Sequence, residues 1–399
     1  MERLLKSTDL SGFQDATKRV PTDAWPSGAF FRKMRVRGCG AKRHPHIVTG
    51  MTASMTGLVN FAKEPYSVEL REVPVPDIGE EDVLLAVQAV GVCGTDVHVY
   101  TGTQQGQLKY PVILGHEFSG VIAKTGSRVR TFKDGDRVTS ETAAGLPPDS
   151  ALLRQGLYNL EPKRVGFGFG ANGAMAQFVK VPERCLHHLP ASLSFEKAAL
   201  TEPCCVAYNA VCSNSHIRPG DSVAVIGPGP IGLLSAIMAR LSGAGHLLVI
   251  GVPADAERLE VARQIGAQTT LGAHNEDITD WVSNFGDGYG FDLVIDAAGV
   301  SATLKLALDI VRPAGQITKV GWGPQPFNDS LDQLVKKAVT LQGSFSHNWP
   351  IWESVISLVG SGRIDLDPIL SRVVPLTDWR GVFDDMHSGK IVKGVLEPS

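Results

Sequence analysis

A glycine-rich turn in the middle of the chain limits the possible folds more than any other feature of the sequence. Residues 227–232, GPGPIG, follow an apolar strand-like run and precede an apolar segment long enough for a helix. In such a context the first glycine permits a tight turn, the second lets the backbone approach a pyrophosphate, and the third lets the helix pack on the strand. The helix N-terminus would face the anion. We therefore expect a dinucleotide to contact Gly227, Gly229, Pro230, Ile231 and Gly232; the alternative is an ordinary glycine turn of an α/β protein.

The pattern of the chain changes at about Pro203. Beyond it, short apolar strands expected at 221–226, 247–250, 293–295 and 316–320 alternate with helix-length segments at 231–243, 255–266 and 301–312. This alternation predicts a parallel sheet with helical crossovers. Before it, short strands separated by Gly, Asp and Pro turns predict a barrel-like β domain, at 82–90, 112–114, 120–123, 137–139 and 178–181. The β-rich part of the chain begins near Leu58. From about residue 345 the sequence is expected to be irregular, with one helix at 350–361.

The second strand of a dinucleotide-binding sheet usually ends in an acidic residue that binds the adenosine ribose. Here the strand at 247–250 runs into Gly251, with Asp255 and Arg258 further on. Nothing at the strand end repels a 2′-phosphate, and no adjacent arginine attracts one. NAD and NADP both remain open, with NAD favoured, and Gly251, Asp255 and Arg258 are the candidates for the ribose side of the site.

The overall charge and the cysteines exclude several classes of protein. A formal net charge of −3 over 399 residues gives no electrostatic reason to expect a nucleic-acid or membrane partner. The uncharged stretch 222–239 is long enough to span a membrane, but it contains the glycines and prolines of the turn. Six cysteines without a CxxC pair favour reduced thiols and a cytoplasmic location.

The first fifty residues differ from the rest. They contain ten Lys or Arg against four Asp or Glu, and they show no sustained apolar period. We expect residues 1–54 to form a flexible N-terminal extension, or to be upstream sequence translated from a misplaced start. An Arg-rich targeting arm is the alternative.

Three polar clusters in the β-rich half contain the residue types that hold catalytic zinc. They are residues 91–98, GVCGTDVH, residues 115–120, GHEFSG, and residues 201–203, TEP. Taken singly, Cys93 could be a small buried side chain, His116 a turn histidine and Glu202 a surface acid. Their occurrence beside a dinucleotide-binding turn favours a metal site.

With these motifs, residues 55–399 resemble the zinc-dependent medium-chain dehydrogenases. Residues 115–129, GHEFSGVIAKTGSRV, are similar to that family's zinc signature, and further motifs follow in the family's order at 91–98, 134–138, 173–178 and 227–232. Glu202, where other branches have Cys, resembles the polyol (sorbitol or L-iditol) and L-threonine dehydrogenases. The resemblance implies an α/β protein with a GroES-like β-rich catalytic domain and a Rossmann domain built on a doubly wound parallel sheet.

The resemblance also implies a metal site. Cys93, His116 and Glu117 would hold one catalytic Zn²⁺, with Glu202 as a ligand that exchanges with water or as a hydrogen-bond partner. Which of the two glutamates is the direct third ligand stays open. Zinc would act as a Lewis acid on a small-molecule alcohol whose hydride passes to the nicotinamide.

A proton relay completes the expected mechanism. By the same resemblance, Thr95 would bond the alcohol oxygen, and His98 would carry the proton to solvent by way of the cofactor ribose. The alternative for His98 is an ordinary surface histidine. Residues 345–349 lie where the chain should re-enter the catalytic domain, and they are a weaker candidate for the pocket wall.

One departure from the family is informative. Many members carry a structural zinc in a four-cysteine loop. Here the four ligand positions fall at Pro147, Ser150, Leu153 and Glu161, none of which is a thiol. We therefore expect the loop without its metal, and one zinc per chain.

These expectations give a domain plan and a function. The predicted parts are an extension (1–54), a catalytic domain (55–203), a Rossmann domain (204–344) and a return to the catalytic domain (345–399). The leading hypothesis is the oxidation of a secondary alcohol of a polyol to a ketone by a cytoplasmic homo-oligomer, a dimer or a tetramer. The alternatives are L-threonine 3-dehydrogenase and, from another class, a dinucleotide-sensing binding protein without catalysis; a zinc-free quinone reductase would need neither Cys93 nor His116.

Overall fold

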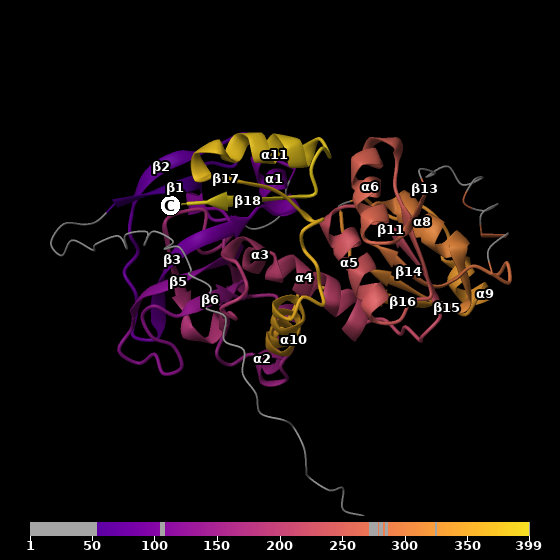
Figure 1. Ribbon diagram of the computed structural model, residues 1–399, viewed down its shortest axis with the longest axis horizontal. Coiled ribbons are helices and arrows are strands. Elements are labelled where there is room, and N and C mark those ends of the chain that lie inside the picture. Colours follow the sequence, from indigo (N-terminus) through magenta and orange to yellow (C-terminus); the bar gives the residue numbers. More distant parts are fainter. Residues whose placement is uncertain are drawn as a thin grey trace, which may run out of the picture. The chain divides into compact units, whose positions relative to one another are not determined.

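The computed structural model describes residues 54–103, 108–270, 278, 282–283, 286–323 and 325–398 (Figure 1). The chain separates into the units 1–49 and 50–399, and every described residue belongs to the second. The predicted flexible extension at 1–54 therefore lies outside the described residues, apart from Ser54.

The β-rich half is built from three sheets within the described residues. A three-stranded sheet has the order β2-β1-β4, and a two-stranded sheet pairs β7 with β8. The largest has the order β10-β6-β5-β3-β18-β17, with β9 also paired to β3. The bounds are β1 Ser54–Asn60, β2 Val68–Pro74, β3 Asp82–Gly91, β4 Val112–Ile113, β5 Glu117–Thr125, β6 Arg137–Ser140, β7 Ala143–Gly145, β8 Val165–Gly166, β9 Phe178–Pro182, β10 Leu186–His188, β17 Leu370–Pro375 and β18 Lys393–Glu397.

The second half is a parallel sheet of six described strands. Its order is β13-β12-β11-β14-β15-β16, with each neighbouring pair parallel. The bounds are β11 Ser222–Ile226, β12 His246–Ile250, β13 Gln268–Thr270, β14 Phe291–Asp296, β15 Val311–Lys319 and β16 Thr340–Gly343. β11 is buried at all five positions, as expected of a strand covered on both faces. The predicted fold, a GroES-like β domain with a doubly wound parallel sheet, is confirmed.

The helices connect and cover these sheets. Their bounds are α1 Gly94–Tyr100, α2 Ala151–Arg154, α3 Phe195–Ala199, α4 Thr201–Tyr208, α5 Pro230–Leu241, α6 Ala256–Gln264, α8 Ser301–Ile310, α9 Asp332–Lys336, α10 Trp349–Gly360 and α11 Trp379–His387. Helices α5, α6, α8 and α10 lie within two residues of their predicted bounds. Helix α4 continues into one π-helical turn, Asn209–Ser213.

The C-terminal segment departs from the sequence prediction. It is not irregular with one helix, because β17, α11 and β18 follow α10. Strand β18 pairs with β3, through Val395 opposite Gly91 and Leu396 opposite Val90. Figure 1 shows the yellow end of the chain beside indigo strand β3. Strands β17 and β18 are short, and β18 joins the sheet by pairing with β3, about 300 residues away in the chain, so local periodicity gave too weak a signal. The first strand also begins earlier than expected, because Ser54 already pairs with Pro74.

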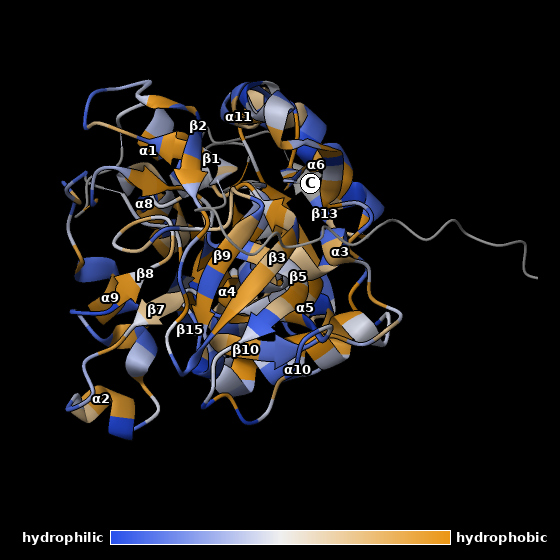
Figure 2. Cartoon of the chain, turned by 90° about the vertical axis from the view of Figure 1, so that its left-hand side faces the viewer, coloured by the Kyte–Doolittle hydropathy of each residue, from blue (hydrophilic) through white to orange (hydrophobic). Residues whose placement is uncertain are grey.

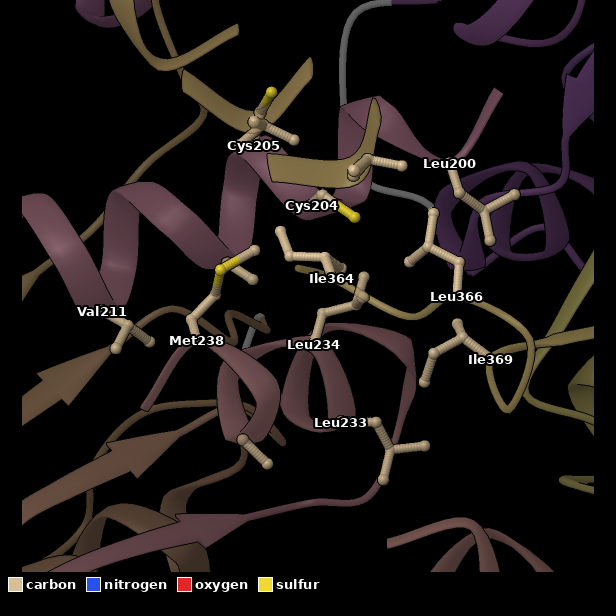
Figure 3. Close-up of a cluster of buried hydrophobic side chains, with 14 of the residues drawn as sticks. Leu200, Cys204, Cys205, Val211, Leu233, Leu234, Met238, Ile364, Leu366 and Ile369 are labelled. Carbon is tan, nitrogen blue, oxygen red and sulfur yellow. The ribbon is translucent and has the colours of Figure 1, made fainter. Parts of the chain in front are cut away.

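One hydrophobic cluster is shared by both halves. Figure 3 shows buried side chains of α4, α5 and the segment 364–369 in contact, among them Cys204, Leu234 and Leu366. The same cluster extends to Ala89 on β3 and Val395 on β18. Each Å² of buried apolar surface contributes about 25 cal/mol to the free energy of folding. Because residues of both halves are buried in this cluster, the two halves stabilise each other.

Hydropathy follows the layers of the fold. Figure 2 shows apolar residues concentrated along strands such as β3, which has Val83, Leu85 and Val90 fully buried. No helix in the described ranges combines the length and the apolar character that crossing a membrane requires.

Candidate functional site

The register of two antiparallel strands places three candidate metal ligands together. Gly91, at the end of β3, lies opposite Glu117, at the start of β5. Cys93 follows β3 and precedes α1, so it reaches the side of His116. The ligand atoms of Cys93, His116 and Glu117 all lie within 4.8 Å of one another. Gly91 must be small here, because a Cβ at this position would lie 2.4 Å from Glu117 Oε2.

The donor set of this cluster fits zinc. It offers a thiol, an imidazole and a carboxylate, the three side-chain types that hold catalytic zinc. His116 and Glu117 are buried, and Cys93 is half-buried. His116 Nδ1 makes no hydrogen bond to any described residue, although it is buried. Oε2 of Glu117 is a second buried atom without a hydrogen-bond partner in the described part of the chain. Buried polar atoms without partners are costly, and a cation held by this donor set would offset that cost.

Asp96 is a residue that the sequence analysis did not single out. Its Oδ1 lies 3.9 Å from His116 Nδ1, and its Oδ2 accepts a hydrogen bond of 2.9 Å from the Cys93 backbone N–H. Burial would lower the pKa of His116, but the charges of Cys93 and Asp96 and a hydrogen bond to Cys93 raise that pKa to about 10. Burial raises the pKa of Asp96. Asp96 thus lies beside the ring of His116, at ion-pair distance and without a hydrogen bond.

A buried lysine faces Glu117, the acid of the cluster of candidate metal ligands. Lys393 Nζ, on β18, lies 2.7 Å from Oε1 and 2.6 Å from Oε2 of Glu117. Burial raises the pKa of Glu117, and Lys393 opposes that rise. The ammonium group donates a hydrogen bond to Oε1, whereas Oε2, although close to it, has no hydrogen-bond partner among the described residues. A lysine directly before the apolar run Gly394-Val395-Leu396 was the signal in the sequence, and it was missed.

Glu202 is held by a different partner. It lies at the start of α4, outside the set of atoms within 4.8 Å. Its Oε1 is 2.9 Å from Nε2 of His347, whose Nδ1 accepts a 2.8 Å hydrogen bond from Trp352 Nε1. Burial would raise the pKa of Glu202, but the hydrogen bond and charge of His347 outweigh it and lower the pKa. The sequence alone makes His347 only a weak candidate, as one of the residues 345–349 that could line the substrate pocket.

The two relay candidates lie on the same short helix but in different surroundings. The Cys93 thiol lies 3.6 Å from Thr95 Oγ1, so Thr95 is at the edge of the cluster. His98 is exposed, and its Nδ1 lies 2.9 Å from Thr103 Oγ1. No hydrogen bond joins His98 to Thr95 among the described residues. The relay stays a prediction.

The glycine turn has the geometry its pattern predicts. Gly227 has φ +99°, a conformation that only glycine adopts freely. A Cβ at Gly232 would lie 1.8 Å from the carbonyl oxygen of Gly227. A Cβ at Gly229 would have nothing within 4 Å, so open space lies at the N-terminus of α5, where Pro230 and Ile231 form the first turn.

The ribose-side candidates make contacts within the protein. Asp255 Oδ2 accepts a 3.0 Å hydrogen bond from the Val252 backbone. Arg258 donates to the carbonyls of Met386, at 3.0 Å, and Ile391, at 3.2 Å. Gly251 follows β12 and is buried. The guanidinium of Arg258 therefore links α6 to the C-terminal segment, and its role toward a cofactor stays a prediction.

A pocket of about 440 Å³ lies at the carboxyl ends of β15 and β16. In open α/β sheets, ligands bind beyond the carboxyl ends of the strands. The wall contributed by the sheet is formed by residues 319–322 and 342–345, and the opposite wall includes Leu157, Asn159 and Leu160.

The loop that was expected to lack a structural zinc is held by hydrogen bonds. Ser150 Oγ donates a hydrogen bond to Glu161 Oε2 at 2.5 Å. Two of the four positions where structural-zinc ligands would be expected therefore bond to each other. Tyr158 donates to Glu141 Oε2 at 2.8 Å. These contacts close the loop without a thiolate.

Two family models match most of the described unit. The alcohol dehydrogenase GroES-like domain matches residues 79–191, and the zinc-binding dehydrogenase domain matches residues 230–361.

Several curated proteins are similar over nearly their whole length. The chain is 34% identical to D-arabitol-phosphate dehydrogenase of Enterococcus avium, over 87% of this chain and 98% of that protein. It is 35% identical to sorbitol dehydrogenase of Halalkalibacterium halodurans, over 82% and 95%. It is 34% identical to L-threonine 3-dehydrogenase of Bacillus velezensis, over 84% and 96%.

Two solved structures of dehydrogenases are also similar to the chain, in fold and in sequence. Alcohol dehydrogenase TADH from Thermus sp. ATN1 has a TM-score of 0.77 and 33% identity, covering 86% of this chain and 99% of that chain. A zinc-binding dehydrogenase from Sinorhizobium meliloti, solved with NADP bound, has a TM-score of 0.78 and 27% identity, covering 87% and 100%.

Proposed function

Since the chain belongs to the zinc-binding dehydrogenases of the medium-chain alcohol dehydrogenase family, we propose that it oxidises a secondary alcohol of a polyol to a ketone with NAD or NADP. The observation that carries the proposal is the buried cluster of Cys93, His116 and Glu117 beside Glu202. Relatives named sorbitol and D-arabitol-phosphate dehydrogenase support the substrate class.

The chain's own residues divide the work. Cys93, His116 and one of the two glutamates would hold zinc, which when bound supplies Lewis acidity to the substrate hydroxyl while the nicotinamide accepts the hydride. Asp96 lies at ion-pair distance from His116, and Lys393 balances the charge of Glu117.

Proton and cofactor handling fall to two further elements. Thr95 holds the substrate hydroxyl by a hydrogen bond, and His98 passes its proton to solvent. The N-terminus of α5, beginning at Gly229, binds the pyrophosphate through backbone N–H groups. NAD remains favoured over NADP; the homo-oligomer and the cytoplasmic location stay predictions.

Arg164 is compatible with an anionic substrate, either a polyol phosphate or the substrate of the second candidate function, L-threonine 3-dehydrogenase. Its Nη1 donates to Ser346 Oγ at 3.2 Å, and the charge of Glu202 acts on it. Within the described part of the chain, Arg164 has no carboxylate at ion-pair distance. A guanidinium in this setting would suit a substrate carboxylate or phosphate.

The test is a substrate panel. Sorbitol, D-arabitol, D-arabitol phosphate, 2,3-butanediol and L-threonine are each assayed with NAD and with NADP by the absorbance of the reduced nicotinamide. We expect the highest kcat/KM with a polyol or polyol phosphate. A higher kcat/KM with L-threonine would establish the second candidate, and zinc-free protein without turnover would establish the binding protein.

Arg164→Met sharpens the panel. It should lower kcat/KM for the anionic substrates by about 10- to 100-fold, the loss expected when a charged hydrogen bond of roughly 1.5–3 kcal/mol is removed, and leave neutral polyols unchanged. Equal loss for all substrates would mean that Arg164 only stabilises the fold.

A further inference from the structure

Three side chains from two distant parts of the chain form a hydrogen-bonded series that ends at Glu202. Trp352 Nε1 donates to His347 Nδ1 at 2.8 Å, and His347 Nε2 lies 2.9 Å from Glu202 Oε1. Trp352 and His347 are 0% and 2% exposed, and their rings meet edge to face at 5.1 Å. The series is therefore dry and rigid at the end away from Glu202.

The series fixes the tautomer of His347. An indole N–H can only donate, so the imidazole Nδ1 that faces it must accept and carries no proton. In the neutral ring the proton is then on Nε2, which donates to Glu202 Oε1. A hydroxyl group in the place of the indole could donate or accept, and would allow either tautomer. Trp352 allows only the tautomer with its proton on Nε2.

The backbone that carries His347 is also anchored to the helix that carries Glu202. Ser346 has φ +56°, a strained conformation for a residue with a side chain. Its carbonyl accepts a 2.8 Å hydrogen bond from Asn209 Nδ2, in the π-helical turn that extends α4. Glu202 and its partner thus share one rigid support, although they are 145 residues apart.

We propose that His347 is a positioning residue for the metal site: by holding Oε1 of Glu202 through a tautomer set by Trp352, it directs the second oxygen, Oε2, toward the cluster of Cys93, His116 and Glu117. Oε2 makes no hydrogen bond within the described ranges, so it is available. This inference rests on the zinc site of the proposed function and is independent of which substrate is oxidised.

The test measures the metal site directly. Zinc affinity is determined by competition with a chromogenic chelator, and the cobalt(II)-substituted protein is examined by its visible absorption. We expect His347→Leu to weaken zinc binding by about 10- to 100-fold and to shift the cobalt bands, which is the usual cost of removing a partner that orients a ligand. His347→Gln, whose amide can still donate to Glu202, should restore most of the affinity.

Two further variants separate positioning from folding. Trp352→Phe keeps a ring but removes the donor, so it should weaken zinc binding less than His347→Leu and shift the cobalt bands in the same direction. His187→Gln is the matched control, because His187 is also buried and stacks on Trp352 at 5.3 Å but contacts Glu353 instead of Glu202. It should change the melting temperature without changing the cobalt spectrum.

A double variant tests the route through Glu202. On a Glu202→Gln background, His347→Leu should cause no further loss of zinc affinity. Unchanged zinc affinity and cobalt spectrum in His347→Leu would overturn the proposal, as would an equal additional loss in the double variant. If His347→Leu does not fold, the other variants decide. The proposal is overturned if His347→Gln and Trp352→Phe both keep the wild-type cobalt spectrum and Trp352→Phe binds zinc as tightly as His187→Gln. These readouts need no substrate, so they remain decisive if no polyol is oxidised.

Discussion

Lys393 and Glu117 form an ion pair almost completely removed from water, with side chains 2% and 1% exposed. Removing one partner of such a pair leaves an uncompensated buried charge and costs about 3–5 kcal/mol. We therefore expect Lys393→Met to lower the free energy of unfolding by about that amount. Urea denaturation followed by fluorescence measures the change.

Lys390→Met is the control for that variant. Lys390 is 68% exposed and lies 3.9 Å from Asp385, so its loss should change the free energy of unfolding by less than about 0.5 kcal/mol. Equal effects of the two variants would show that Glu117 is neutral in the folded protein.

His98 allows a prediction about pH. Partial burial, and to a smaller extent the charge of His387, lower the pKa of His98, so its ring is neutral at pH 7 and able to accept a proton. His98→Ala should lower turnover at neutral pH by about 100-fold. Hydroxide can take over as the pH rises, so the pH optimum should shift upward. The pH profile of kcat is the measurement.

Zinc content and a second histidine provide the controls. His98→Ala should bind as much zinc as the wild type, and loss of zinc would mean that His98 is a ligand. His188→Ala, at an exposed histidine of β10 that stacks on Phe132, should keep both turnover and the pH optimum.

At the scale of single residues, the sequence predicted what is local. Cys93, His116 and Glu117 belong to short motifs whose spacing is visible in the chain, and the pairing of β3 with β5 brings them together. Lys393 and His347 could not be paired with their acids, because 276 and 145 residues separate the partners. Only the tertiary fold creates those neighbours.

At the scale of elements, the glycine turn separates the needs of the fold from those of the ligand. Gly232→Ala would place a Cβ 1.8 Å from a carbonyl oxygen, and such overpacking costs about 1–3 kcal/mol, so its melting temperature should fall. Gly229→Ala meets nothing within 4 Å at φ −69°, so its melting temperature should be unchanged. It should nevertheless bind NAD about tenfold more weakly or worse, a loss of about 1.4 kcal/mol, because its methyl group fills the space for the pyrophosphate.

Calorimetry and NAD titration of the two variants decide this prediction. If Gly229→Ala binds NAD as tightly as the wild type, the pyrophosphate does not approach this turn. If Gly229→Ala unfolds as early as Gly232→Ala, then the glycine serves the fold instead of the ligand.

The loop of residues 147–161 leads to a prediction about metal content. Because Ser150 bonds to Glu161 and Tyr158 bonds to Glu141, the loop is closed without thiolates. We expect elemental analysis to give one zinc per chain, and exhaustive chelation to leave this loop as resistant to proteolysis as before. Two tightly bound zinc ions per chain would contradict the prediction.

The elements differ in how well the sequence predicted them. Strands β11, β12 and β14 and helices α5, α6 and α8 were predicted because apolar strands and long helices repeat at regular spacing there. Strand β13, of three residues, was not predicted. Helix α1 was not predicted, since its seven residues lie inside a motif that was interpreted chemically. Strands β17 and β18 are stabilised by pairing with each other and with β3, which no local pattern reveals.

At the scale of the whole molecule, the described unit contains three hydrophobic clusters, one of which is shared by both halves. All the residues given for these clusters lie at Met55 or beyond it. A chain beginning at Met51 retains all of β1, which starts at Ser54. We expect it to keep the melting temperature, zinc content and specific activity of the full chain. A loss of several-fold in activity or a clear fall in melting temperature would show that the extension packs on the enzyme.

The position of Lys393 near the end of the chain has a consequence for biosynthesis. The ribosome delivers Cys93, His116 and Glu117 first, whereas His347, Trp352 and Lys393 emerge more than 200 residues later. Until then, the carboxylate of Glu117 has no ammonium partner, and Glu202 has no imidazole to hold it. N-terminal segments fold first during synthesis, so the nascent β domain must wait for β18 before its largest sheet and its metal site are complete. We therefore expect the proposed zinc site to reach its full affinity only after β18 has been synthesised and has paired with β3.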